Sequence, residues 1–415
     1  MKKPVACKQR RHSRLHPGFV LSVLLPLMIF SANVSLWAQP ALQSNSRQTI
    51  VNKMNDYLGE ALTAMNLPGG MGGLSVLVRV PSGDYFASTV PGAKPEWHFR
   101  AASVTKTTTA AAIMLLEQRG LVRLDDTVTS LIPGRNIPYL PDTRDYAVPH
   151  KERITIRQLL QHRAGVYDVG NDAVPAEAAQ PYAGQGYIEW MNEQDPEHSF
   201  SIDELVAVAA NCGLTYGPPP AKYHYSNTGY SMLGKIIERA SGKSLDEFLY
   251  AEFIRPLGLS STYLVVSGKD RMPRSPYLPG YSSGEGQFLE TTEDNASYAH
   301  AEGNMVSTFP ELAAWIRALM RGEAGVSPEN AARMREVLPT NPEGTAGYGL
   351  GITENPKGLG YGHDGGIMGY FTVARHHLES DFTIIMVCNH LKFDDLYGMQ
   401  GAAYGAAMKI KALFE

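Results

Sequence analysis

The sequence predicts an α/β fold in which the two ends of the chain build one sheet and a mainly helical segment is inserted between them. Strand-like segments occur at residues 73–80 and 84–90, and again between residues 348 and 389. The region between them is rich in loops and in the periodicity of amphipathic helices. The chain has 415 residues, 44% of them hydrophobic, which is enough for one large domain or two intertwined ones.

The N-terminal segment differs in composition from the rest of the chain. It begins with six Lys or Arg residues and no acidic residue, and an apolar run follows at residues 19–30. A polar stretch then leads to the small residue Ala38, and this order is typical of a secretory signal peptide. A membrane anchor is the alternative, but a span needs about 20 apolar residues, and this shorter run contains Pro26. We expect a signal peptide at residues 1–38, a secreted or periplasmic protein, and no stable membrane anchor after cleavage.

The charge and the cysteines exclude several classes of protein. The chain has 37 basic and 41 acidic residues, and the leader holds six of the basic ones, so the remainder carries a formal net charge of −10. Such a surface does not favour nucleic acid or an anionic bilayer as a partner. Beyond the leader only Cys212 and Cys388 remain. One disulfide is therefore possible, but a fold that depends on several disulfides is excluded.

The N-terminal part of the mature chain predicts a helix, two strands and a second helix. The first helix, residues 46–66, has apolar residues spaced three and four apart. The strands at 73–80 and 84–90 are joined by a Pro-Ser-Gly turn. The second helix, residues 103–120, contains the sequence AAAIMLL. This segment is apolar on every side, so we expect the second helix to be buried.

The middle of the chain predicts short helices separated by loops. Ser201 and Glu204 form a capping box, and Gly213 ends the helix that they begin. Residues 167–200 are polar and contain prolines, so we expect a long loop at the edge of a site. The helices expected in this region are residues 154–162, 201–213, 227–240 and 244–253.

The C-terminal part returns to strands. Two helices are expected first, at residues 310–321 and 327–338, the second with Ser327 as its cap and Pro328 in its first turn. A terminal helix closes the chain. The expected strands are residues 348–354, 368–375 and 382–389.

These elements suggest a division into two domains. Residues 45–125 and 305–415 would form the sheet domain, and residues 126–304 would form the mainly helical insert. A cleft between the two would be the natural place for a ligand.

The sequence SVTK, at the start of the second helix, is the first candidate for chemistry. Ser103 and Lys106 are three residues apart, so on a helix they share one face. Free N–H groups at a helix start can stabilise an oxyanion. Burying a lysine without a partner is costly, which indicates a specific task for Lys106. Desolvation or nearby cations can lower the pKa of a lysine until the neutral amine accepts the serine proton. A serine cap followed by a surface lysine is the alternative.

Residues 99–128, FRAASVTKTTTAAAIMLLEQRGLVRLDDTV, resemble the active-site segment of the serine β-lactamase and penicillin-binding superfamily. The branch that it resembles most holds class C β-lactamases and secreted D-alanyl-D-alanine carboxypeptidases. The resemblance implies a β-lactamase/transpeptidase-like fold, with helices flanking an antiparallel sheet. It continues through residues 154–168, 223–259, 303–320 and 361–370, so it covers nearly the whole mature chain.

Three motifs carry catalysis in that superfamily. The Ser-x-x-Lys motif corresponds to Ser103 and Lys106. The Tyr-x-Asn motif corresponds to Tyr225 and Asn227. The resemblance implies that Tyr225 shuttles a proton to the leaving group as a general acid or base. It also implies that the Asn227 amide contacts Lys106 and holds the carbonyl of the substrate's acyl side chain.

The third motif is Lys-Thr-Gly in many members and His-x-Gly in the carboxypeptidase-like branch, and here it is residues 363–365. The resemblance places it on a strand that lines the site, with His363 facing the cleft. Gly365 and Gly366 would let a substrate backbone approach the edge of that strand. By analogy with the family, the N–H of Gly366 completes an oxyanion hole with the N–H of Ser103.

Other readings of the same residues are weaker. His363 and Asp364 cannot both serve one serine from a strand, because adjacent side chains point to opposite faces. A metal site would need more ligands, and the other histidines of this region show no ligand spacing.

Two further short motifs are also weak. The sequence GYSSG, residues 280–284, matches a nucleophile elbow around Ser282, but its flanks predict a loop rather than a strand and a helix. The sequence ASGKSL resembles the end of a phosphate loop but has Ile237 in place of the leading glycine, so it reads as a helix stop.

We therefore expect acyl transfer in two steps through Ser103, with no metal or organic cofactor. The expected function is a D-alanyl-D-alanine carboxypeptidase-like serine hydrolase that cleaves amide bonds of D-amino-acid peptides, with a peptidoglycan-type peptide as substrate. A β-lactamase acting on β-lactams, and an esterase or D-aminopeptidase, are alternatives on the same site. A penicillin-binding sensor is the alternative that is not an enzyme. Asp364 bears on this choice, because an ionised carboxylate facing the substrate would repel a free substrate carboxylate.

Overall fold

The computed structural model describes residues 38–415 except residues 285 and 356–357, and residues 46–415 form one compact unit. The expected signal peptide lies outside the described residues, apart from Ala38. Within the described part, none of the helices combines the length and apolarity needed to cross a bilayer.

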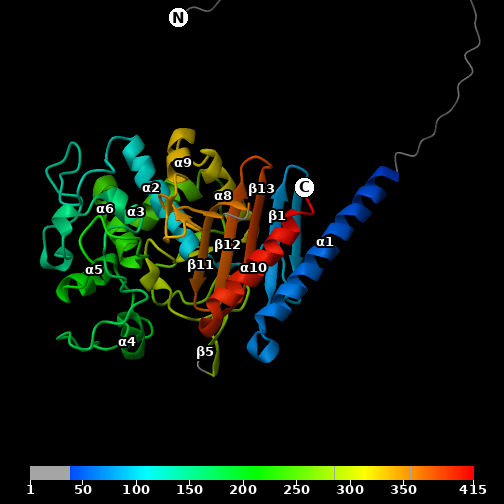
Figure 1. The fold of residues 1–415 in the computed structure, drawn as a ribbon, viewed down its shortest axis with the longest axis horizontal. Helices are drawn as coiled ribbons and strands as arrows, with labels where there is room; N and C mark the ends of the chain where they lie inside the picture. Colours follow the sequence, from blue (N-terminus) through cyan, green and yellow to red (C-terminus); the bar gives the residue numbers. More distant parts are fainter. Residues whose placement is uncertain (1–37, 285, 356–357) are drawn as a thin grey trace, which may run out of the picture. The chain divides into compact units, whose positions relative to one another are not determined.

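An eight-stranded antiparallel sheet organises the compact unit, with the strand order β2-β1-β13-β12-β11-β10-β9-β8 (Figure 1). Strand β1 pairs with β13 and places Leu74 opposite Cys388, so the sheet joins strands from both ends of the chain. This confirms the α/β fold class and the antiparallel sheet. The strands are β1 (Leu74–Val80), β2 (Gly83–Ser88), β8 (Leu338–Pro339), β9 (Gly347–Tyr348), β10 (Thr353–Asn355), β11 (Gly360–Ile367), β12 (Tyr370–His377) and β13 (Phe382–Cys388).

Helices cover both faces of this sheet. On one face pack α10 (Leu396–Lys411) and the part of α1 (Ala38–Met65) from Ser46 onward. On the other face lie α8 (Phe309–Arg321) and α2 (Lys106–Gln118). Alternate residues of a strand point to opposite faces. Val76 and Val78 accordingly join the core under α1 and α10, and Leu77 joins the core of α2 and α8.

The middle of the chain forms short helices around α2, with α6 packed against both α2 and α5. The predicted capping box is confirmed, because Ser201 accepts a hydrogen bond from the N–H of Glu204 and Glu204 bonds back to Ser201. The remaining helices are α3 (Ile156–Leu160), α4 (Tyr187–Gln194), α5 (Ile202–Asn211), α6 (Asn227–Ser241), α7 (Leu245–Leu249) and α9 (Pro328–Met334).

Two small sheets of three strands complete the fold, and both lie outside the main sheet. One has the order β3-β7-β4, with β3 (Phe99–Arg100), β7 (Met305–Ser307) and β4 (Tyr263–Leu264). The other has the order β14-β5-β6, with β14 (His390–Lys392), β5 (Tyr281–Gly284) and β6 (Gln287–Glu290).

Several local predictions were wrong. Residues 167–200 are not entirely loop, because α4 buries Tyr187 and Ile188 against the core. The helix expected at 327–338 ends at Met334, whose carbonyl accepts a hydrogen bond from the N–H of Leu350. The segment expected as one strand at 348–354 is interrupted between β9 and β10.

The loop expected around Ser282 is also wrong, because this residue lies in strand β5, which pairs with β14 and β6. The described residues after β5 form another strand rather than the helix that a nucleophile elbow needs. Cys212 and Cys388 are both free, so they do not form the disulfide that the sequence left open.

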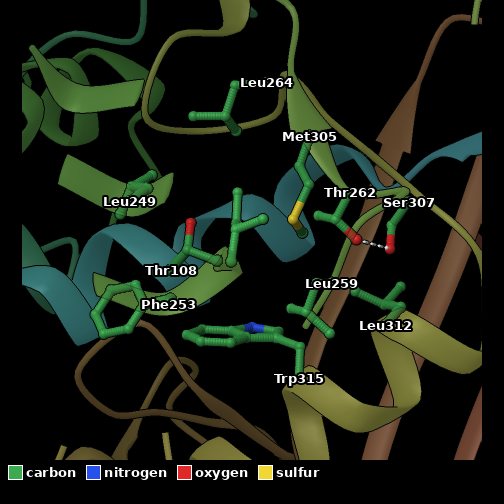
Figure 2. A pocket seen from close by; sticks show the side chains of 11 residues that line it. Thr108, Leu249, Phe253, Leu259, Thr262, Leu264, Met305, Ser307, Leu312 and Trp315 are labelled. Atoms are coloured by element: carbon green, nitrogen blue, oxygen red, sulfur yellow. Dashed lines mark hydrogen bonds between the residues drawn. The ribbon is translucent and has the colours of Figure 1, made fainter. Parts of the chain in front are cut away.

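A small cavity beside α2 belongs to the core rather than to a binding site (Figure 2). Its volume is about 10 Å³, the space of roughly one water molecule. The few polar groups that line it have partners, since the Thr262 and Ser307 hydroxyls lie 2.8 Å apart and the Thr108 hydroxyl donates to the Thr105 carbonyl. None of the candidate catalytic residues lines it.

Candidate active site

Ser103 lies in a 3-10 turn, Ala102–Thr105, that leads directly into α2. The preceding residue, Ala102, has a φ of 51°, a left-handed conformation that is uncommon for a residue with a Cβ. The surrounding structure holds it there, because Ala102 is fully buried and its carbonyl accepts a hydrogen bond from the Thr105 hydroxyl. Ser103 itself is only half-buried. The turn therefore presents the serine at the surface of an otherwise closed core.

Lys106, the first residue of α2, is fully buried and contacts three oxygen atoms. Its Nζ lies 3.2 Å from Ser103 Oγ, 2.6 Å from Asn227 Oδ1 and 3.0 Å from the carbonyl oxygen of Glu302. Loss of solvent lowers the pKa of Lys106 to about 8, although the negative charges of Glu302 and Asp168 oppose the shift. The neutral amine is therefore a minor but accessible form at neutral pH and becomes the main form above about pH 8.

Tyr225 and Asn227 reach the same place from the start of α6. Ser226 caps this helix by accepting a hydrogen bond from the N–H of Gly229. Burial raises the pKa of Tyr225 well above its ordinary value, and the Ser103 side chain nearby opposes this shift. The Nζ of Lys106 lies 4.8 Å from the centre of the Tyr225 ring, close enough for a cation–π interaction when the amine is charged.

Strand β11 forms the other wall of the site. Gly365 is essential to the close approach, because a Cβ there would lie 2.7 Å from the Ser103 nitrogen and 2.6 Å from the Ala101 carbonyl oxygen. Gly366 is exposed, and a Cβ on it would meet no atom closer than 3.7 Å. Strand β10 pairs only with residues 360–362 of β11. The edge of β11 beyond Gly362 therefore has no β10 partner, which leaves room for an extended ligand.

His363 lies beside the site but bonds to Tyr348 rather than to Ser103. Its Nε2 is 2.9 Å from the Tyr348 hydroxyl, and its Nδ1 contacts the Asp364 carbonyl. Burial, followed by the charge of Lys106, lowers the pKa of His363 to about 3. The ring is therefore neutral, with Nδ1–H donating to the carbonyl and Nε2 accepting from Tyr348.

Asp364 points away from Ser103, toward α10. Its carboxylate accepts hydrogen bonds from Arg375, at 2.8 Å, and from the Tyr404 hydroxyl, at 2.5 Å. The alternation expected along a strand is thus present, with His363 on one face and Asp364 on the other. The negative charge of Asp364 is paired with Arg375 and does not face a substrate.

His162 was not predicted as a site residue, and it packs against the Tyr225 ring with ring centres 4.2 Å apart. Its Nδ1 accepts a hydrogen bond from the N–H of Ser226, the residue between Tyr225 and Asn227. Burial lowers the pKa of His162 well below its ordinary value, so this ring is also neutral. The only signal for it in the sequence is its place as the last residue of the helix expected at residues 154–162.

Two buried carboxyl groups near Lys106 were also missed. Asp168 is 2% exposed, accepts hydrogen bonds from Asn171 and Gly170, and lies 3.5 Å from Asn227 Nδ2. Glu302 is 3% exposed, and its Oε2 has no hydrogen-bond partner among the described residues. Burial raises the pKa of both carboxyl groups. Their only signal in the sequence is their position. Asp168 is the last residue of one segment that resembles the superfamily, and Glu302 directly precedes another.

No group of three or more His, Cys, Asp or Glu side chains in the described part of the chain is arranged to hold a metal ion. The structure instead brings together Ser103, Lys106, Tyr225 and Asn227, with Gly365 against the serine and His363 behind Tyr348. This fold and this constellation define a serine hydrolase. The chain belongs to the Beta-lactamase family, whose model matches residues 63–405, and the predicted superfamily is thereby confirmed.

Individual relatives agree with this assignment. Penicillin-binding protein 4* of Bacillus subtilis (strain 168) is 27% identical over 305 residues, which cover 70% of this chain and 60% of that protein. The chain therefore spans less than two thirds of that relative's length.

Among solved structures, a D-stereospecific amidohydrolase from Streptomyces sp. has a TM-score of 0.69 at 26% identity, with 85% of this chain and 98% of that one covered. The D-amino acid amidase of Ochrobactrum anthropi SV3, in complex with L-phenylalanine amide, has a TM-score of 0.69 at 22% identity, with 88% and 98% covered. The second likeness shows the fold alone.

Proposed function

We propose that this protein is a secreted serine hydrolase that cleaves amide bonds of D-amino-acid peptides through an acyl-enzyme, in the manner of a D-alanyl-D-alanine carboxypeptidase. The observation that carries the proposal is the set of three contacts made by the buried Lys106. A neutral amine has two hydrogens and one lone pair. Its hydrogens suit the oxygens of Asn227 and Glu302, which leaves the lone pair for the hydroxyl of Ser103.

In the first step the Ser103 oxygen attacks the substrate carbonyl while its proton passes to Lys106. The carbon–nitrogen bond then breaks, and Tyr225 delivers a proton to the leaving amine. The acyl group remains as an ester on Ser103. In the second step the same groups take a proton from water, which releases the acid and restores the serine.

The negative charge that develops on the carbonyl oxygen needs donors on the opposite side of the cleft. The N–H of Ser103 at the start of α2 and the N–H of Gly366 on β11 are the proposed pair. Gly365 makes this arrangement feasible, since any side chain there would separate β11 from the serine turn. The unpaired edge of β11 would receive the substrate backbone as an added strand.

The outward direction of Asp364 supports a substrate with a free carboxylate, because the repulsion that this aspartate would cause is absent. The relative from Bacillus is named a penicillin-binding protein and the neighbour from Streptomyces a D-stereospecific amidohydrolase. Hydrolysis of an amide bond next to a D-amino-acid residue is a reaction that is consistent with both names. Secretion rests on the sequence of the leader alone.

A substrate panel tests the proposal. A D-Ala-D-Ala peptide, D-alanine amide, nitrocefin and a short-chain nitrophenyl ester are compared by kcat/KM, with Ser103→Ala as the inactive control. We expect hydrolysis of the D-Ala-D-Ala peptide, and its loss in the control. An inert peptide beside rapid turnover of nitrocefin or the ester would replace the proposal with a β-lactamase or an esterase.

A further inference from the structure

The side-chain amide of Asn227 lies between Lys106 and the buried carboxyl group of Asp168. Its Oδ1 is 2.6 Å from Lys106 Nζ, and its Nδ2 is 3.5 Å from Asp168 Oδ2. The backbone of Gly170 packs against the same amide, since a Cβ there would lie 3.1 Å from Asn227 Nδ2. An amide has one end that accepts hydrogen bonds and one end that donates them. A carboxylate at the position of Asp168 therefore selects one orientation, with the amide oxygen toward Lys106.

The backbone of a tight turn, residues 168–172, holds Asp168 in this position. The Asp168 carbonyl accepts hydrogen bonds from the N–H groups of Asn171 and Asp172. Its own N–H donates to the Tyr216 hydroxyl at 3.0 Å. Asp168 is 2% exposed, so its side chain has little freedom to turn away from the site.

The side-chain contacts of Asp168 favour the ionised carboxylate. One oxygen accepts from the Gly170 N–H at 3.1 Å, and the other accepts from Asn171 Nδ2 at 2.8 Å. Burial raises the pKa of Asp168, but these donors, the charge of Lys106 and the Asn227 amide oppose the rise. The turn thus presents a negative charge to the NH2 end of Asn227.

Glu302 is the other buried carboxyl group whose charge acts on Lys106. Its backbone oxygen lies 3.0 Å from Lys106 Nζ, but its Oε2 has no hydrogen-bond partner among the described residues. The Nδ2 of Asn227 donates to Asp168 instead. Of the two carboxyl groups, Asp168 is therefore the one that also reaches the lysine through an amide.

The orientation of the Asn227 amide decides where the lone pair of Lys106 can point. With its oxygen toward the lysine, the amide accepts one hydrogen of the neutral amine, and the lone pair is left for Ser103. With the amide turned over, its NH2 group would compete with the Ser103 hydroxyl for that lone pair. A lysine engaged in this way is a poorer base toward the serine.

We propose that Asp168 is a positioning residue that fixes the Asn227 amide and so directs the lone pair of Lys106 at Ser103. This inference rests on the proposed function, in which Ser103 is acylated. Asp168 does not take part in proton transfer. It acts through the amide and through the negative charge that it places near the lysine.

Other ionisable groups face these residues from several elements. Around Lys106 and Asp168 they are His162, Tyr167, Asp172, Tyr216, Tyr225, Tyr230, Glu302 and His363. Burial lowers the pKa of both histidines and raises the pKa of the tyrosines, so these rings are neutral near neutral pH. The carboxyl groups are thus the charges that can shift the pKa of Lys106, and Asp168 and Glu302 are the two that act on it.

The pH dependence of acylation tests the role of Asp168. The rate constant for acylation of Ser103 by a nitrophenyl ester is measured from about pH 6 to pH 9. Asp168→Asn keeps an oxygen for the Gly170 N–H but removes the charge that raises the pKa of Lys106. We expect the inflection near pH 8 to move down by at least about half a pH unit. The plateau should fall by about tenfold, because the Asn227 amide loses the acceptor that orients it.

A second aspartate of the same turn provides the matched control. The Asp172 carboxylate accepts a hydrogen bond from the Tyr216 hydroxyl and is not one of the charges that act on Lys106. Asp172→Asn should therefore keep the wild-type inflection, with a plateau within about twofold. Melting temperatures of both variants check their folding.

Two further variants show whether Asp168 acts through Asn227. In the background Asn227→Ala the amide is absent, so adding Asp168→Asn should lower the plateau by less than about twofold. The exchange Asp168→Asn/Asn227→Asp keeps a donor facing an acceptor but brings the carboxylate into contact with Lys106. Its inflection should therefore move above pH 8, opposite to that of Asp168→Asn. This exchange also serves as the test if Asp168→Asn does not fold.

The outcomes separate this inference from the proposed function. Wild-type kinetics in Asp168→Asn would overturn the positioning role and leave the serine hydrolase intact. A lower plateau with an unchanged inflection, and the same loss in the Asn227→Ala background, would reduce Asp168 to a residue of its own turn. If Ser103 of the wild-type protein is not acylated at all, the proposed function fails and this inference fails with it.

Discussion

At the scale of single residues, the proposed acylation of Ser103 depends on the complete burial of Lys106. The sequence motif predicted the pairing of Ser103 with Lys106, because residues three apart on a helix share a face. It could not supply the other partners of the lysine, which come from segments more than 100 residues away, at Asn227 and Glu302. The same limit applies to His162 and Tyr348, whose side chains bond to residues 64 and 15 positions away.

The pH dependence of kcat/KM should report the ionisation of Lys106. Its pKa is lowered to about 8 by burial, and only the neutral amine accepts a proton, so the rate should rise with pH and level off above about 8. The neutral His363, with a pKa near 3, should add no inflection near its ordinary value. Rates measured from about pH 6 to pH 9 provide the check, and a flat or falling profile would contradict the role of Lys106.

His162 should act as a positioning residue for Tyr225. His162→Phe keeps a ring beneath Tyr225 but removes the acceptor of the Ser226 N–H, which leaves a buried donor unsatisfied at a cost of about 1–3 kcal/mol. We expect lower stability and a kcat reduced by about tenfold, with a smaller change in KM. The neighbouring exposed histidine provides the control, His224→Phe. Values of kcat within twofold of wild type for both variants would exclude the positioning role.

At the scale of elements, the site is formed where three segments meet: the serine turn before α2, the start of α6 and the strand β11. The sequence predicted these elements well because their signals are local, such as the helix caps and the alternating strands at both ends of the chain. It missed α4, whose buried aromatic face lies between proline-bearing loops, and it extended α9 past the point where Leu350 bonds to Met334.

Two adjacent glycines of β11 give a matched test of how closely the strand must approach Ser103. Gly365→Ala should lower kcat/KM by about a hundredfold or more, because the new Cβ would meet the Ser103 nitrogen at 2.7 Å and displace the nucleophile. Gly366→Ala has space for its methyl group on the opposite side of the strand and should be nearly neutral. Similar kinetics for the two variants would contradict the arrangement of this wall.

At the scale of the whole molecule, one sheet joins both ends of the chain and carries two buried, neutral histidines, His363 and His376. The α/β class, the antiparallel sheet and the family followed from the sequence. The small sheet of β14, β5 and β6 did not, because the segment GYSSG pairs on one side with β14, which lies more than 100 residues away in the sequence.

Acid should destabilise the protein through these histidines. Burial lowers the pKa of His363 to about 3 and that of His376 to about 4, whereas both are near 6.5 in the unfolded chain. The unfolded state therefore binds more protons below pH 6.5, and each histidine contributes a slope of up to about 1.4 kcal/mol per pH unit as the pH falls toward 4. Denaturant unfolding across this range measures the slope, and His376→Gln should reduce it. An unchanged slope in this variant would exclude His376 as a contributor.

The central claim is that Ser103 becomes acylated with help from Lys106, and peptide mass spectrometry tests it most directly. The protein is incubated with a labelled penicillin or an activated ester, digested, and searched for the modified peptide. We expect a single adduct on Ser103, absent in Ser103→Ala and formed at least about a hundredfold more slowly in Lys106→Ala. An adduct on another residue, or one that persists in Ser103→Ala, would contradict the account.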